Sequence, residues 1–214
     1  RASDALALTG PNARISAEAS ENNGRAGDII ITGPLVTVAD GATIEASNRD
    51  AGKGGNINFR NLQALTLRNG QIIATTQTGQ AGNIDITASE QVRLQDGSTL
   101  SVATTESEGT DDTAELETSS RLSRSRNGDA NVPTAGSLVI ESDRLDVESD
   151  SAILVQSPNG QAGSIDFTSR LIQLNHGTIN AATTQNSRAN SDSAAINISD
   201  FELLLLENDS FISA

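Results

Sequence analysis

The sequence predicts an all-β fold, a right-handed parallel β-helix (solenoid) with three strands per coil and about seven coils of about 27 residues. Three observations support this prediction. A short motif of small residues and alternating apolar residues recurs along the chain, and each copy is followed by two further alternations separated by turn residues. The apolar residues are mainly Ile, Leu, Val and Ala, with four Phe and no Trp, Tyr, Met or Cys, which suits a thin, elongated core.

The recurring motif opens each unit and is clearest in AGNIDIT, which begins at Ala81. The second residues of successive copies are separated by 28, 27, 54, 27 and 31 positions. A period of 27 with one double gap predicts regular coils interrupted by one long insertion. These second residues are Gly27, Gly55, Gly82, Gly136, Gly163 and Ala194.

Each copy of the motif is followed by a second apolar alternation, a turn residue and a third alternation. The second alternations are Val36 and Val38, Leu65 and Leu67, Val92 and Leu94, Leu145 and Val147, Ile172 and Leu174, and Leu204 and Leu206. The turn residues are Gly41, Gly70, Gly97, Asp150, Gly177 and Asp209. The third alternations are expected to point inward at Ile44 and Ala46, Ile73 and Thr75, Leu100 and Val102, Ile153 and Val155, Ile179 and Ala181, and Ile212 and Ala214.

Stacking is required because three short strands cannot close a core by themselves. Strand one of each coil should pair in parallel with strand one of the next, which satisfies the backbone groups and dries the interior. Leu6, Leu8, Ile15 and Ala17 fit a partial first unit, which brings the count to seven. The helix-period half of a leucine-rich repeat and the four strands of a propeller blade are missing from the pattern.

The extra residues fall at one corner, between the third strand and the next copy of the motif. Residues 105–134 form the long insertion, residues 185–192 a smaller one, and residues 47–53 occupy the same corner in the second coil. The long insertion opens acidic and closes basic, and it suits either a short helix over residues 113–123 or a polar loop. Residues 1–214 are interpreted as a single β-helix fragment of a longer protein, since both ends fall inside a repeat.

Charge, the length of the apolar runs and the lack of Cys exclude several partners and sites. A net charge of −14 repels nucleic acid phosphates and anionic lipid, so nucleic acid binding is not expected. No apolar run approaches the length of a spanning helix, so no membrane insertion is expected. The missing Cys excludes disulfides and thiolate metal sites.

Catalytic and metal-binding patterns are weak in this sequence, and no enzyme is predicted. On the outward side of strand one, Asp85 and Asp166 are two coils apart with Val139 between them. Two carboxylates at such a spacing could suit an inverting glycoside hydrolase, but no further acidic or basic residue joins them in this row, so the pattern indicates solvated surface. On strand two, Arg93 is expected to pair with Asp146. No cofactor is expected, with Ca²⁺ at the acidic insertion as the alternative.

Candidate interaction residues lie in the insertion and near the carboxyl end. In the run FELLLLE, alternation leaves Leu203 and Leu205 outward, where a neighbouring segment or subunit could cover them. The insertion contributes its charged residues to the same prediction. The complete candidate interaction surface is Asp111, Asp112, Arg121, Arg124, Arg126, Leu203 and Leu205.

The stretches AGNIDITASEQVRLQDGSTLSVATT and GGNINFRNLQALTLRNGQIIATTQTGQAGNI resemble the repeats of filamentous-haemagglutinin-type exoproteins, especially those of cyanobacteria, which are exported by two-partner secretion. The resemblance extends from Asp4 to Ala214. It implies a secreted or cell-surface rod that serves adhesion, aggregation or matrix building. The amino-terminal secretion domain of that family is absent from this sequence, so the export route rests on the resemblance alone.

Two functions therefore follow as expectations. The first is a non-catalytic structural and adhesive rod whose partners are neighbouring copies or flanking coils of the same protein and cell-surface glycans. The alternative is a carbohydrate-binding or polysaccharide-cleaving β-helix with its site beside residues 105–134. Aromatic platforms for sugars are few, since Phe59 and Phe167 are both expected to point inward.

Overall fold

The computed structural model describes residues 4–20, 24–105, 133–158, 161, 163–182 and 194–214. All of the secondary structure in these residues is β, and the parallel strands stack into a solenoid of about six turns spaced about 28 residues apart. The six complete turns follow a partial turn made by β1 and β2, which accounts for the seven units expected from the sequence. The predicted fold class, a parallel β-solenoid, is confirmed.

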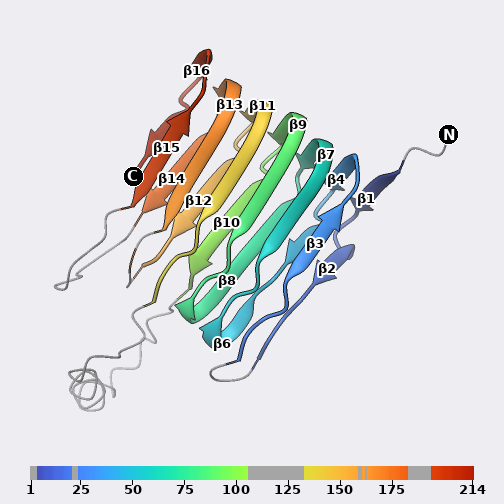
Figure 1. Cartoon of the computed structure of the whole chain (residues 1–214), viewed down its shortest axis with the longest axis vertical. Coiled ribbons are helices and arrows are strands. Elements are labelled where there is room, and N and C mark those ends of the chain that lie inside the picture. Colours follow the sequence, from blue (N-terminus) through green and yellow to red (C-terminus); the bar gives the residue numbers. More distant parts are fainter. Residues whose placement is uncertain (1–3, 21–23, 106–132, 159–160, 162, 183–193) are drawn as a thin grey trace.

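The strands form two sheets that run along the stack (Figure 1). Sheet A contains β1 (Ala5–Thr9), β3 (Ile29–Thr32), β4 (Leu35–Ala39), β7 (Ile57–Arg68), β9 (Ile84–Gln95), β11 (Leu138–Glu148), β13 (Ser164–Asn175), β15 (Ala195–Ser199) and β16 (Leu203–Glu207). Sheet B contains β2 (Arg14–Ser16), β5 (Thr43–Glu45), β6 (Asn48–Lys53), β8 (Gln71–Gln80), β10 (Thr99–Thr104), β12 (Ala152–Gln156), β14 (Thr178–Ala182) and β17 (Phe211–Ser213).

The first two predicted strands of each coil are continuous in the central turns. β7, β9, β11 and β13 each carry both alternations, and Figure 1 shows these long strands side by side in chain order. Irregular pairing separates the two halves of β7, where Asn61 has a φ of 57° and the register shifts between Phe59 and Leu62. The three predicted strand segments are therefore present, but two of them share one bulged strand.

The interior is a single column of aliphatic side chains, as the alternation predicts. Ile57, Ile84 and Ile165 are fully buried, and so are Phe59 and Phe167. Matching residues of successive coils lie directly opposite each other in the parallel register, so each turn places its side chains on those of the turn before. The stack buries apolar surface that no single coil could cover.

The corners between sheet A and sheet B explain one error in the predicted register. In the corner after β9, both Asp96 and Gly97 have positive φ, and the amide of Ser98 donates to the carbonyl of Gln95 at 3.2 Å. This arrangement is a type I′ turn, and turns of the same length follow β4, β11 and β16. The corner after β7 is one residue shorter, with positive φ at Asn69 alone.

The shorter corner shifts every side chain of the following strand to the opposite face. Ile72 and Ala74 are fully buried and pair in register with β10, while Ile73 and Thr75 face outward. The prediction that Ile73 and Thr75 point inward is therefore wrong. The prediction that Ile179 points inward is correct. The corner before it, at His176 and Gly177, has the same short length as the corner after β7, and the predicted spacing between Gly177 and Ile179 matches that length.

The corner assigned to residues 47–53 is also different from the prediction. It is not a loop, because Asn48–Lys53 forms β6 and pairs with the end of β8. The other two extra segments fall on residues outside the described part of the chain, apart from Thr105, Pro133 and Thr134. Thr134 forms isolated parallel bridges with Gln80 in the preceding turn and with Gln161 in the following turn. The chain therefore rejoins the stack at Thr134, in line with the equivalent corners of the neighbouring turns.

Candidate interaction surfaces

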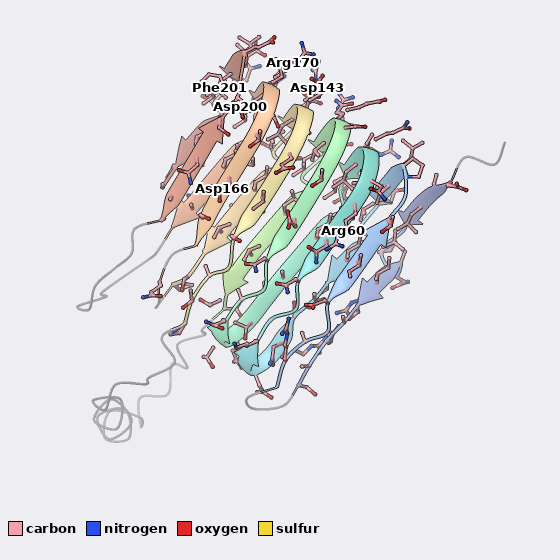
Figure 2. All side chains as sticks on the ribbon, viewed as in Figure 1. Arg60, Asp143, Asp166, Arg170, Asp200 and Phe201 are labelled. Carbon is pink, nitrogen blue, oxygen red and sulfur yellow. The ribbon has the colours of Figure 1, made fainter. Side chains whose placement is uncertain are left out.

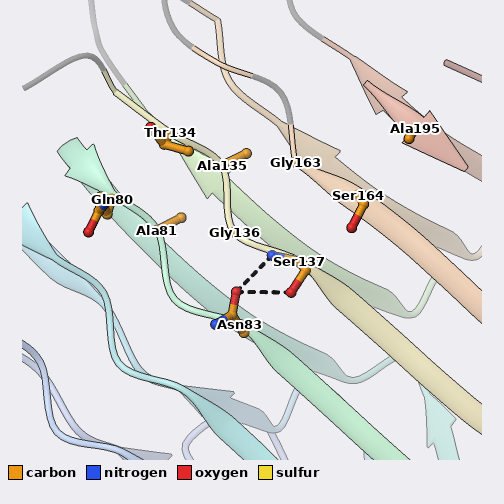
Figure 3. A pocket seen from close by; sticks show the side chains of 10 residues that line it. All are labelled: Gln80, Ala81, Asn83, Thr134, Ala135, Gly136, Ser137, Gly163, Ser164 and Ala195. Atoms are coloured by element: carbon orange, nitrogen blue, oxygen red, sulfur yellow. Dashed lines mark hydrogen bonds between the residues drawn. The ribbon is translucent and has the colours of Figure 1, made fainter. Parts of the chain in front are cut away.

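A groove lies on the outside of the stack where the chain enters the long strands. It measures about 480 Å³ and is lined by residues of four successive turns, including Gln80, Asn83 and Ser164 (Figure 3). Thr134, the last residue of the 105–134 insertion, lines this groove, so the groove lies beside the insertion. The ten lining residues carry amide, hydroxyl and methyl groups and no titratable side chain, so they can hydrogen bond but offer no acid or base.

A ladder of hydrogen-bonded polar side chains includes Asn83 and Ser137 of this groove and continues beyond it to Asn56 and Asp28. The Asp28 carboxylate accepts from the backbone and side-chain amides of Asn56 at 2.8 and 3.0 Å. The side-chain oxygen of Asn56 accepts in the same way from the backbone and side-chain amides of Asn83 at 3.0 and 3.2 Å. Asn83 in turn accepts from the amide and hydroxyl of Ser137 at 2.8 and 3.1 Å (Figure 3).

The ladder also sets the charge at its first member. The hydrogen bond from the Asn56 backbone amide, aided by nearby Arg25, holds the pKa of Asp28 below its ordinary value of 3.8. The sequence interpretation did not recognise this ladder. Its signal was available, because Asp28, Asn56 and Asn83 directly follow the anchor glycines at separations of 28 and 27 residues.

The outward row of strand one lies in the predicted order. Asp85, Val139 and Asp166 are consecutive partners in the parallel register. Asp166 accepts from the hydroxyl of Ser164 at 2.8 Å and from the amide of Asn197 at 2.6 Å. Neither aspartate lines the groove, and the two are separated by two strand spacings, roughly 10 Å, with an apolar side chain between them.

The predicted ion pair between Arg93 and Asp146 is wrong, although the two residues are opposite each other in the register. Asp146 is buried, and its carboxylate already accepts hydrogen bonds from two other side chains. Arg144 donates from Nε to both carboxylate oxygens at 2.8 Å, and the side-chain amide of Gln91 donates at 2.5 Å. Arg93 reaches diagonally to Glu148 at 2.9 Å instead. The competing cation, Arg144, lies two residues before Asp146 on the same face of the same strand. Its hydrogen bond to Asp146 raises the pKa of the Arg144 guanidinium.

A charged cluster at the bend of the long strands was not predicted. Arg170 on β13 makes a bidentate contact with Asp143 on β11 at 2.8 and 3.0 Å and lies 3.5 Å from Glu202. Figure 2 shows Arg170 and Asp143 together at this bend, apart from Asp166 near the start of β13. The guanidinium lowers the pKa of the Asp143 carboxyl. The two residues are 27 positions apart, which is one repeat, so the repeat period indicates that they lie opposite each other in adjacent coils.

The carboxyl-terminal coil carries the apolar part of the predicted interaction surface. Leu203 is 51% exposed and Leu205 is half-buried, and both point outward from β16 as predicted. Phe201 and Phe211 are also about half exposed on this coil. Figure 2 shows Phe201 beside Asp200 at the end of the stack.

The charged part of the predicted surface lies outside the described residues. It comprises Asp111, Asp112, Arg121, Arg124 and Arg126, together with the alternative Ca²⁺ site. Within the ranges that the structure describes, no group of three or more His, Asp or Glu side chains is arranged to hold a metal ion. In the same ranges, no helix has the length and apolar character to cross a bilayer.

The chain matches no protein-family model, no curated protein and no solved structure.

Proposed function

We propose that the chain is a structural and adhesive rod, without catalytic activity, that serves as a surface filament or matrix component outside the cell. The observation that carries this proposal is the unbroken stack of parallel turns around one dry core. Hydrogen bonds between turns run along the stack, and outward positions of successive turns lie opposite each other in the parallel register. Such an object is suited to hold surface groups at fixed intervals.

The carboxyl-terminal coil supports pairing with a further strand. Leu206 points inward on β16 and is 42% exposed, while its partner Leu174 in the preceding coil is fully buried. The outer edges of β15, β16 and β17 have no partner among the described residues. Unpaired strand edges favour pairing with another strand, so flanking coils or neighbouring copies are the natural partners.

The secreted or cell-surface location is part of the proposal and is supported by the resemblance described above. The experiment has two arms. Electron microscopy and small-angle scattering should give elongated particles, and compact globules would contradict the structural role. Beads coated with the chain should be retained under flow on films of cell-surface glycans, and washing off at the rate of bare beads from every film would contradict the adhesive role.

The second candidate function is carbohydrate binding at the groove in Figure 3. The favouring observation is the set of amide and hydroxyl groups on its walls, which match the hydroxyls of a neutral sugar. Titration with soluble oligosaccharides should show binding that Gln80→Ala weakens and that Gln77→Ala, an exposed position on the same strand outside the groove, leaves unchanged. Because the lining residues supply no acid or base, bound oligosaccharides should remain uncleaved, and release of new reducing ends would contradict this assignment.

A further inference from the structure

The two sheets differ sharply in charge. In sheet B, strands β8, β10, β12, β14 and β17 contain no Asp, Glu, Lys, Arg or His. In sheet A, β9, β11 and β13 each carry both acidic and basic residues, and β7 carries two arginines. The net charge of the whole chain is −14. The outward side of these five strands of sheet B, called the uncharged face below, is therefore a neutral surface on an acidic molecule.

The uncharged face is bounded on its amino-terminal side by charged residues. Arg14 on β2 forms ion pairs with Glu18 and with Glu45 on β5. The neighbouring β6 adds Arg49 and Lys53. Charge is thus present on the first coils of sheet B and stops at β8, so the neutral character belongs to a defined region.

The uncharged face is also even. The pairings from β8 through β10 and β12 to β14 keep one register without a shift, whereas the sheet A pairings of β7 with β9 and of β9 with β11 contain shifts. Its central row consists of Ile73, Ser101, Leu154 and Asn180, which are aligned partners and are all half-buried between their neighbours. The middle of the face therefore presents methyl, hydroxyl and amide groups on a regular surface, and the exposed Gln71 and Gln77 of β8 and the half-exposed Phe211 of β17 lie on its two edge strands.

We propose that the uncharged face pairs with the same face of a second copy of this chain. Two molecules of net charge −14 repel each other, and this face lets them approach without placing like charges in contact. Small side chains also allow two sheets to pack at the usual face-to-face distance of about 10 Å. The contact is isologous, because each copy contributes the same strands.

The size of the face sets the strength of the contact. Five strands about 4.8 Å apart, with about five residues of about 3.3 Å each, give roughly 400 Å² per copy. The total of about 800 Å² is at the low end for protein interfaces and is below that of a stable dimer. The association is therefore weak and reversible. It does not depend on the adhesive role proposed above, since the central row of the face, from Ile73 to Asn180, lies outside the groove and away from Leu203 and Leu205.

Salt provides the first test. Sedimentation velocity over a concentration series should show reversible self-association that strengthens several-fold between about 0.05 M and 1 M NaCl, because salt screens the repulsion between the acidic molecules and the neutral contact loses nothing. A monomer at all concentrations in high salt, or an association that weakens as salt is added, overturns the proposal.

Charge substitutions provide the second test. Ser101→Glu and Ser101→Lys, at the middle of the face, should each abolish self-association, and an equimolar mixture of the two variants should restore it. The restoration separates loss of the contact from loss of folding. Thr37→Glu is the matched control, because Thr37 points outward on sheet A between Ala7 and Thr66 and should leave association unchanged. Association that survives both Ser101 substitutions overturns the proposal.

Other occupants of the face give distinct outcomes. Self-association that appears only after residues 106–132 are replaced by a short linker would make that insertion the occupant and overturn the proposal. Binding of the monomer to neutral polysaccharide that Ser101→Glu abolishes, without self-association of the native chain, would assign the face to glycan and overturn it as well.

Discussion

The carbonyl oxygen of Gly55 lies 1.8 Å from the position that a Cβ atom on Gly82 would occupy. The two glycines are equivalent residues of adjacent coils, and Gly136 and Gly163 repeat the same close approach one and two coils further on. At this point the backbones of successive turns are packed more closely than any side chain permits. The recurring glycine of the anchor motif is therefore a packing requirement of the stack.

Gly82→Ala should lower the free energy of unfolding by roughly 2–4 kcal/mol, because the backbone itself must move to admit the methyl group. Urea denaturation followed by circular dichroism measures the loss. Gly27→Ala is the matched control in the first complete coil, where a new Cβ would meet only the Ala17 side chain at an ordinary 3.5 Å. Equal effects of the two substitutions would contradict this explanation of the glycine column.

The polar ladder should respond to the loss of one donor. In Asn83→Asp, the new carboxylate keeps the bonds from Ser137 but places an oxygen against the side-chain oxygen of Asn56, to which the native Asn83 amide donates at 3.2 Å. Since the ladder is exposed, a loss of about 1 kcal/mol is expected at neutral pH. The loss should shrink in acid, where the protonated carboxyl again donates a hydrogen bond to Asn56.

Ser137→Ala is the contrast for the ladder, because it removes the hydroxyl bond and keeps the backbone bond to Asn83. It should cost less than Asn83→Asp at neutral pH and show no recovery at low pH. Unfolding curves at neutral and acidic pH measure both variants. A pH-independent loss in Asn83→Asp would show that the ladder does not depend on the donor.

Acid should destabilise the fold through its hydrogen-bonded carboxyl groups. The pKa of Asp28 is lowered from 3.8 by the Asn56 amide, so the unfolded chain binds this proton more readily than the folded chain. The stabilisation is complete above about pH 5 and is lost as pH falls through the folded pKa. The pKa values of Glu18 and Asp143 are lowered too, and both act in the same direction.

Asp28→Asn should flatten this acid slope, because the amide oxygen still accepts from Asn56 and no longer titrates. The measurement is the free energy of unfolding between about pH 5 and pH 2. Glu90→Gln is the control, since it removes an exposed carboxyl that makes no hydrogen bond or ion pair with the described residues. An identical slope in Asp28→Asn and the native chain would contradict the role of this contact.

The repeat period predicted the stack because it acts on buried positions. Ile57, Ile84 and Ile165 alternate with polar residues, so only one register buries them. The error at Ile73 has a physical origin, because Ile72 and Ile73 are adjacent and either can satisfy the alternation. The choice between them depends on the length of the preceding corner, which one residue of turn sequence decides.

The candidate surfaces were predicted less completely, because surface contacts depend on competition between neighbours. Register alone placed Arg93 opposite Asp146, but Arg144 on the same strand is closer and displaces it. The pair of Asp143 and Arg170 lies at a bend that the alternation pattern does not describe. The absence of charged residues from β8, β10, β12, β14 and β17 is written in the sequence, but the alternation of apolar residues does not single it out.

A single unsatisfied atom on the uncharged face gives the last prediction. The side-chain oxygen of Asn180 is buried on β14 and has no hydrogen bond partner among the described residues. Asn180→Val removes this acceptor and introduces a residue that favours strands, so the free energy of unfolding should rise by about 1 kcal/mol. Asn197→Val is the matched control, because the Asn197 amide donates to Asp166 at 2.6 Å and the same substitution breaks that bond. Denaturation at a concentration where the chain is monomeric should therefore move the two variants in opposite directions, and a shift of both in the same direction would contradict the assignment of the Asn180 oxygen as unsatisfied.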